Sequence, residues 1–135
     1  MAQPPLALVE CHCADCQKVT GSSFSLGMPV MADAFELIKG ELALWHRTGE
    51  SGHRIPQRIC GHCGTRLYSE PPSGAATLTA RGGTLDDTSW LKPVAAIWTD
   101  SAQPGQDFSN VELTYPRQPE DFGQIIAKWR DYIAA

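Results

Sequence analysis

All five cysteines of this chain lie in two short clusters. The first cluster reads Cys11-His12-Cys13-Ala14-Asp15-Cys16, and the second reads Cys60-Gly61-His62-Cys63-Gly64. Close spacing brings several thiolates to one point at little cost in loop-closure entropy, which suits a metal that prefers sulfur ligands. Because five thiols cannot all pair as disulfides, the clusters predict metal ligands or redox groups within the fold.

Composition and charge narrow the class of protein. The 135 residues include an ordinary 42% of hydrophobic residues, and they predict a single domain over 1–135. The net charge is -4 with no lysine/arginine run, which argues against nucleic-acid binding through phosphate neutralisation. The first residues lack a basic segment followed by an apolar one, and no apolar run approaches a membrane span. We therefore expect a cytoplasmic protein without membrane contact, in a compartment that keeps thiols reduced.

The pattern of apolar segments predicts a mainly β fold with short helices. Strands are expected over residues 6–9, 24–31, 35–38, 42–48, 57–59, 66–69, 75–80 and 94–98. The second cysteine cluster then falls at the tip of a hairpin, as a metal knuckle. The tail differs, because residues 119–133 predict a C-terminal amphipathic helix whose apolar face holds Phe122, Ile125, Ile126, Trp129 and Ile133.

The first cluster has the spacing of a three-thiolate metal site. In an extended Cys-x-Cys, Cys11 and Cys13 face the same side while His12 points away. A helical turn over residues 14–19 would bring Cys16 to the same ion. Three protein ligands leave the fourth tetrahedral position of zinc open for a thiol, which zinc would hold as thiolate. The alternative is a closed structural site, with a fourth ligand from Cys60, Cys63, His46, His53 or His62.

The second cluster supplies two thiolates, Cys60 and Cys63, which make half of a structural zinc site. Glycines around them permit a tight turn. A dithiol redox pair is the alternative interpretation. Nearby, Arg58 and Arg66 either bind a carboxylate or carry solvated surface charge, and Arg81 either holds an anion or marks a turn. The four tryptophans are expected in the core rather than in a binding cage.

Four segments of the chain resemble the glutathione-dependent formaldehyde-activating enzyme family, also called the centromere protein V family. They are residues 11–25, 60–68, 83–87 and 97–104, within a similarity that runs in order from about residue 6 to about residue 120. The resemblance implies an Mss4-like zinc-binding β fold. It also implies that Cys11, Cys13 and Cys16 match the catalytic-zinc triad, and that Cys60 and Cys63 match half of a structural zinc site. The implied activity joins glutathione to formaldehyde as S-hydroxymethylglutathione, which is a carbon–sulfur lyase reaction in reverse.

One element of the family pattern is missing from this sequence. Family members carry an upstream Cys-x-Cys that completes the structural site, whereas only ten residues precede Cys11 here. We therefore expect one zinc on the first cluster, with Cys60 and Cys63 either holding a second zinc or joining the first. A homodimer could cover the exposed sheet edge. The leading hypothesis is a zinc enzyme that activates a small thiol for addition to, or release from, an aldehyde. The alternative is a non-catalytic, zinc-stabilised binding protein.

Overall fold

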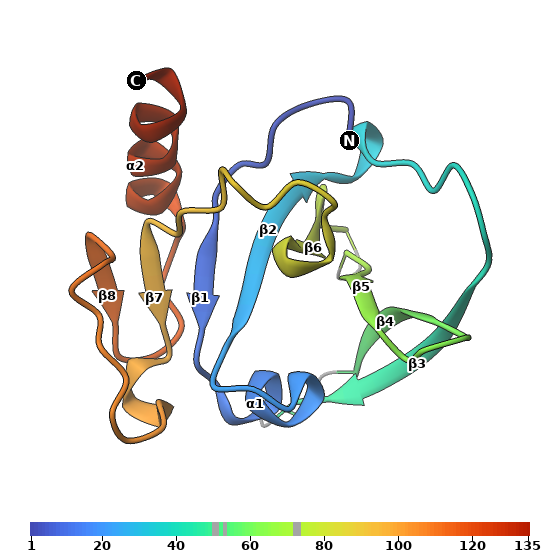
Figure 1. The fold of residues 1–135 in the computed structure, drawn as a ribbon, viewed down its shortest axis with the longest axis horizontal. Helices are drawn as coiled ribbons and strands as arrows, with labels where there is room; N and C mark the ends of the chain where they lie inside the picture. The colour runs from blue at the N-terminus through green and yellow to red at the C-terminus, as the bar shows by residue number, and fades with distance from the viewer. Residues whose placement is uncertain (50–51, 53, 72–73) are drawn as a thin grey trace.

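The computed structural model describes residues 1–49, 52, 54–71 and 74–135, which form one eight-stranded sheet and two α-helices (Figure 1). The strands are β1 (Val9–Cys11), β2 (Ser25–Met31), β3 (Leu42–Thr48), β4 (Arg54–Cys60), β5 (Arg66–Ser69), β6 (Thr77–Arg81), β7 (Ala95–Ile97) and β8 (Leu113–Tyr115). The helices are α1 (Ala14–Thr20) and α2 (Gly123–Ala134), and 3₁₀ turns cover Ala32–Ala34, Gly82–Thr84 and Thr99–Ser101. The expected mainly β fold with short helices is confirmed. No helix in these ranges is long and apolar enough to cross a membrane.

The sheet order places β1 between strands from distant parts of the chain. The order is β3-β4-β5-β6-β2-β1-β7-β8, antiparallel from β3 to β1 and parallel from β1 to β8. Cys11 at the end of β1 is opposite Ser25 on β2 and Ile97 on β7. The first cysteine is therefore fixed by neighbours on both sides.

Helix α2 contributes two fully buried side chains to the core, Ile125 and Trp129. The Trp129 Nε1 donates a hydrogen bond to the carbonyl of Pro5 (2.8 Å), which ties the helix to the N-terminal segment. The expected helix start at residue 119 is wrong, since α2 begins at Gly123, whose N–H donates to the Asp121 carboxylate. Ile133 is 45% exposed, so the apolar face ends before the last turn.

Two expectations about strands and core are also corrected. Residues 35–38 form no strand, because they cross open surface where Ile38 is 88% exposed and meets no ladder partner among the described residues. Strand β8 was not expected, since three residues are too short to show alternation. Trp45 on the edge strand β3 is 44% exposed rather than buried in the core.

Candidate metal centre and substrate cavity

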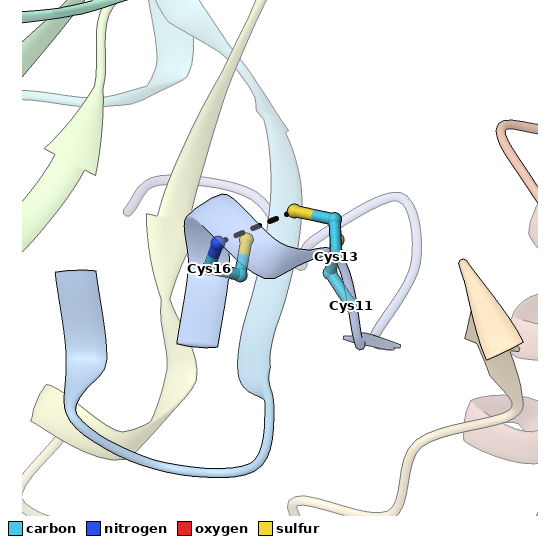
Figure 2. A group of neighbouring side chains, drawn as sticks. All are labelled: Cys11, Cys13 and Cys16. Atoms are coloured by element: carbon cyan, nitrogen blue, oxygen red, sulfur yellow. Dashed lines mark hydrogen bonds between the residues drawn. The ribbon is translucent and has the colours of Figure 1, made fainter. Parts of the chain in front are cut away.

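The sulfur atoms of Cys11, Cys13 and Cys16 lie within 4.8 Å of one another (Figure 2). We call these three residues the thiol cluster. Strand β1 ends at Cys11, and Cys13 is the extended residue that caps α1, where its Sγ accepts a hydrogen bond from the Cys16 N–H (3.3 Å). Gly21 ends the helix in the left-handed conformation (φ 62°), which glycine adopts without strain. The expected strand followed by a helical turn thus gathers all three sulfurs.

The thiol cluster fits a tetrahedral metal. Zinc–thiolate bonds of about 2.3 Å place neighbouring sulfurs about 3.8 Å apart, so three sulfurs within 4.8 Å need only small side-chain adjustments to share an ion. No carboxylate or imidazole among the described residues joins this group. The cluster therefore has the donor set of a three-thiolate site that can hold a metal ion.

The three thiols affect one another's ionisation. Hydrogen bonds with Cys13 and Cys16, followed by burial, raise the pKa of Cys11. Hydrogen bonds from Cys11 and Cys13, and then the charges of two nearby arginines, lower the pKa of Cys16. The direction of these shifts makes Cys16 more acidic than Cys11. A bound cation would draw off the remaining protons.

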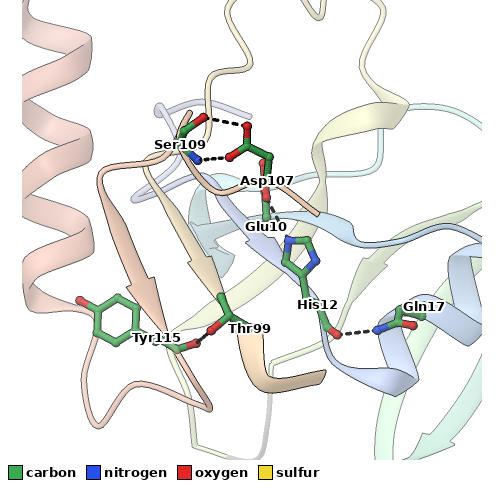
Figure 3. Close-up of polar contacts among 7 residues, drawn as sticks. All are labelled: Glu10, His12, Gln17, Thr99, Asp107, Ser109 and Tyr115. Carbon is green, nitrogen blue, oxygen red and sulfur yellow. Dashed lines mark hydrogen bonds and ion pairs between the residues drawn. The ribbon is translucent and has the colours of Figure 1, made fainter. Parts of the chain in front are cut away.

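His12 lies between Cys11 and Cys13 in the chain, and Figure 3 shows its ring directed toward Glu10 and its carbonyl toward the Gln17 side chain. Its side chain is fully buried, its Nε2 lies 3.0 Å from the Glu10 carboxylate, and its ring packs between Phe24 and Phe108. The His12 carbonyl accepts a hydrogen bond from the Gln17 side chain (2.7 Å). His12 is therefore a packing residue that fixes the segment between two cysteines, as the alternation of the extended chain predicts.

A cavity of about 250 Å³ opens onto the thiol cluster, and Trp98 and Gln118 form part of its wall. Trp98 has a positive φ of 60°, the one non-glycine residue in the described ranges that does. Its Nε1 donates to the Gln118 side-chain oxygen (3.0 Å). A left-handed backbone at a bulky residue costs about 1–2 kcal/mol, and such strain gathers at functional sites. Trp98 is partly buried and packs against the core, as expected, while it also forms part of the cavity wall, and no local sequence signal marks its backbone conformation.

A second cavity, of about 410 Å³, adjoins the first and also reaches the thiol cluster through Cys11 and Cys16. We call it the thiol cavity. Arg47 and Arg81 line it on the polar side, and Ile55 is among its apolar walls. Arg47 was not identified from the sequence, because nothing around it in the chain suggests a site.

The second cysteine pair lies at the expected hairpin tip between β4 and β5. Gly64 has a positive φ of 75°, and the Cys63 Sγ lies 3.1 Å from the Thr65 hydroxyl. Cys60 and Cys63 lie outside the thiol cluster, and within the described part of the chain no third metal-ligating side chain gathers around them. Of the other candidate ligands, His46 and His62 do not join the thiol cluster, and His53 lies outside the described residues. A metal on Cys60 and Cys63 stays a prediction.

Comparison with known proteins agrees with this geometry. A family model for the glutathione-dependent formaldehyde-activating enzyme matches residues 1–101, which include both cysteine clusters and the wall residue Trp98. A comparison with curated proteins gives no significant match. The family match covers about three quarters of the chain. The chain therefore belongs to the glutathione-dependent formaldehyde-activating enzyme family.

Proposed function

We propose that this protein is a zinc-dependent carbon–sulfur lyase of the S-(hydroxymethyl)glutathione synthase kind. The observation that carries the proposal is the convergence of three thiols beside two cavities, with no fourth protein ligand among the described residues. Family membership supports glutathione and formaldehyde as the substrate classes. The strand order around the cysteine segments is compatible with an Mss4-like fold, which we propose as the finer fold assignment.

The reaction joins the sulfur of a thiol to an aldehyde carbon. Zinc held by Cys11, Cys13 and Cys16 would stabilise the substrate sulfur as thiolate and orient it. The thiol loses its proton to solvent at the cavity mouth, a carbon–sulfur bond forms, and the carbonyl oxygen takes up a proton to become a hydroxyl. The same positions serve the reverse reaction, in which the carbon–sulfur bond breaks. The chain contributes position and exclusion of bulk water, with Trp98 closing one side.

Exchange spectroscopy by NMR tests this activity. The zinc-loaded protein should raise the rate of exchange between glutathione and its formaldehyde adduct above the spontaneous rate, by at least about tenfold at saturating enzyme. Protein treated with a chelator should return the exchange to the spontaneous rate. An exchange rate that is the same with zinc-loaded protein, stripped protein and no protein would reject the catalytic proposal and favour a zinc-stabilised binding protein.

We also propose a cytoplasmic location and a homodimer formed at the β3 edge. The reducing cytoplasm would preserve five free cysteines, as the structure has them. Within the described residues, β3 pairs with β4 alone, and Leu44 and Trp45 on it are 47% and 44% exposed. Unpaired edges favour pairing with another strand. Sedimentation velocity should give about twice the chain mass of 14.7 kDa, and a monomer at all concentrations would refute the dimer.

A further inference from the structure

Three arginines converge beside the thiol cluster from three different strands. Arg47 belongs to β3, Arg66 to β5 and Arg81 to β6. We call them the arginine group. Arg66 is only 8% exposed, so its alternative interpretation as a solvated surface charge is wrong. Arg66 and Arg81 lie close together, because both donate to the Ser25 hydroxyl, and burial followed by the charge of Arg66 lowers the pKa of Arg81 to about 10.

Apart from the contact of Arg66 with Cys16, neutral side chains accept the hydrogen bonds of the two inner arginines. The Ser25 hydroxyl oxygen accepts from both Arg66 Nη2 (3.2 Å) and Arg81 Nη1 (3.3 Å). Arg81 Nη2 also donates to the Ser69 hydroxyl (2.7 Å), and Arg66 Nη1 to the Gln57 amide oxygen (3.4 Å). The Nε atoms of both are buried without an acceptor among the described residues. These neutral acceptors position the guanidinium groups without offsetting their charge, and the negative charge that faces them comes from the Cys16 and Cys11 thiols.

Carboxylates of the described residues do not compensate these charges. In the described part of the chain, the acidic residues that form ion pairs are Glu10, Glu70 and Glu112. None of them pairs with the arginine group. Glu70 lines the thiol cavity, but its carboxylate bonds to Arg58. A divalent ion on three thiolates carries one net negative charge, which is less than three guanidinium groups carry. Buried charge without a counter-charge is costly, so the surplus indicates a site prepared for an anion.

An anion in the thiol cavity would lie next to both the arginine group and the thiol cluster. Its volume of about 410 Å³ suits a small molecule, and two members of the arginine group and two of the cysteines line the same space. Arg47 Nε and Nη1 are buried and have no acceptor among the described residues. Arginine suits a carboxylate because its planar fork donates two parallel hydrogen bonds.

We propose that the thiol cavity binds a carboxylate-bearing substrate, with its carboxylate between Arg47 and Arg81 and its reacting group at the thiol cluster. Arg66 supports Arg81 from behind through their shared Ser25. This inference rests on the proposed function and assigns the residues that would hold a substrate carboxylate, a group that glutathione itself carries. The carboxylate belongs either to the thiol or to the aldehyde, as in a 2-oxo acid such as glyoxylate. Formaldehyde, which has none, would occupy only the reacting end.

The test compares each acid with its methyl ester by titration calorimetry on the zinc-loaded protein. The first pair is 3-mercaptopropionate and its ester, which tests a carboxylate on the thiol. The second pair is glyoxylate and its ester, which tests a carboxylate on the aldehyde. In at least one pair the acid should bind about 10- to 100-fold more tightly, the effect of losing hydrogen bonds to a charged group. Equal binding of acid and ester in both pairs would overturn the inference.

Substitutions test whether the arginine group causes the tighter binding of the acid over its ester. Arg47→Gln and Arg81→Gln should each reduce the acid-over-ester ratio at least about tenfold, while the exposed control Arg130→Gln should leave it unchanged. A ratio that survives both cavity substitutions would refute the assignment. Arg47 lies on the solvent-exposed strand β3, so its variant is expected to fold even where Arg81→Gln does not. Circular dichroism verifies folding of each variant.

The outcomes separate this inference from the proposed function. An acid preference that depends on Arg47 or Arg81, without any acceleration of thiol addition, would reject the lyase activity alone. Acceleration of thiol addition with equal use of acids and esters would reject the carboxylate site alone.

Discussion

Cys16→Ser should abolish metal binding and thiol binding together. Cys16 is the most buried member of the thiol cluster, at 5% exposure, and α1 holds it facing Cys11 and Cys13. Two thiolates provide only half of the ligand set that zinc prefers, so the metal content should fall from about one ion per chain to almost none. Elemental mass spectrometry on protein purified without added zinc measures this loss. Calorimetry with glutathione should show no saturable binding in the variant.

Cys63→Ser is the matched control, because it makes the same chemical change at an exposed thiol outside the cluster. If a single ion is held by the thiol cluster without Cys63, the Cys63→Ser variant should contain as much metal as the wild type. Loss of metal in both variants would show that the two cysteine clusters share an ion, which closes the site. Wild-type protein without metal would contradict the metal centre itself.

Trp129→Ala should destabilise the fold by about 3–5 kcal/mol, the range for removing a large buried aromatic side chain. Trp129 is 1% exposed and packs against Trp90 and Tyr132, with ring centroids 6.2 and 5.3 Å away. The substitution also leaves the Pro5 carbonyl without its donor. Urea unfolding followed by circular dichroism gives the change in free energy of unfolding.

Two variants of the same helix calibrate that result. Ile133→Ala removes an apolar side chain that is 45% exposed, and it should cost less than about 1 kcal/mol. Trp129→Phe keeps most of the buried ring and loses the hydrogen bond, so an intermediate cost of about 1–2 kcal/mol is expected. If Trp129→Ala were no more destabilising than Ile133→Ala, then α2 would not be anchored to the core as the structure has it.

Local patterns in the sequence predicted the local parts of this structure. The alternation of an extended chain places Cys11 and Cys13 on one side and His12 on the other, and the structure has this arrangement. The glycines around Cys60 and Cys63 predicted the tight hairpin tip. These features depend on residues a few positions apart, whose geometry follows from backbone preferences alone.

The features that depend on distant residues could not be predicted in this way. The parallel pairing of β1 with β7, and of β7 with β8, is set by packing across the whole sheet rather than by any short pattern. Likewise, Arg47, Arg66 and Arg81 meet only because three strands bring them to one place. Segment 35–38 shows the converse error, since an apolar run favours a strand that the sheet does not include.

The central position of β1 has a consequence for how the protein matures. The three thiols lie within six residues of one another, so a newly made chain can capture metal locally, before any long loop has closed. The charged surroundings of those thiols come from β3, β5 and β6, and β1 itself is completed only when β7 has been synthesised. Long-range pairing of this kind forms slowly. For the proposed metal centre and carboxylate site, metal loading would therefore precede completion of the substrate site during biosynthesis.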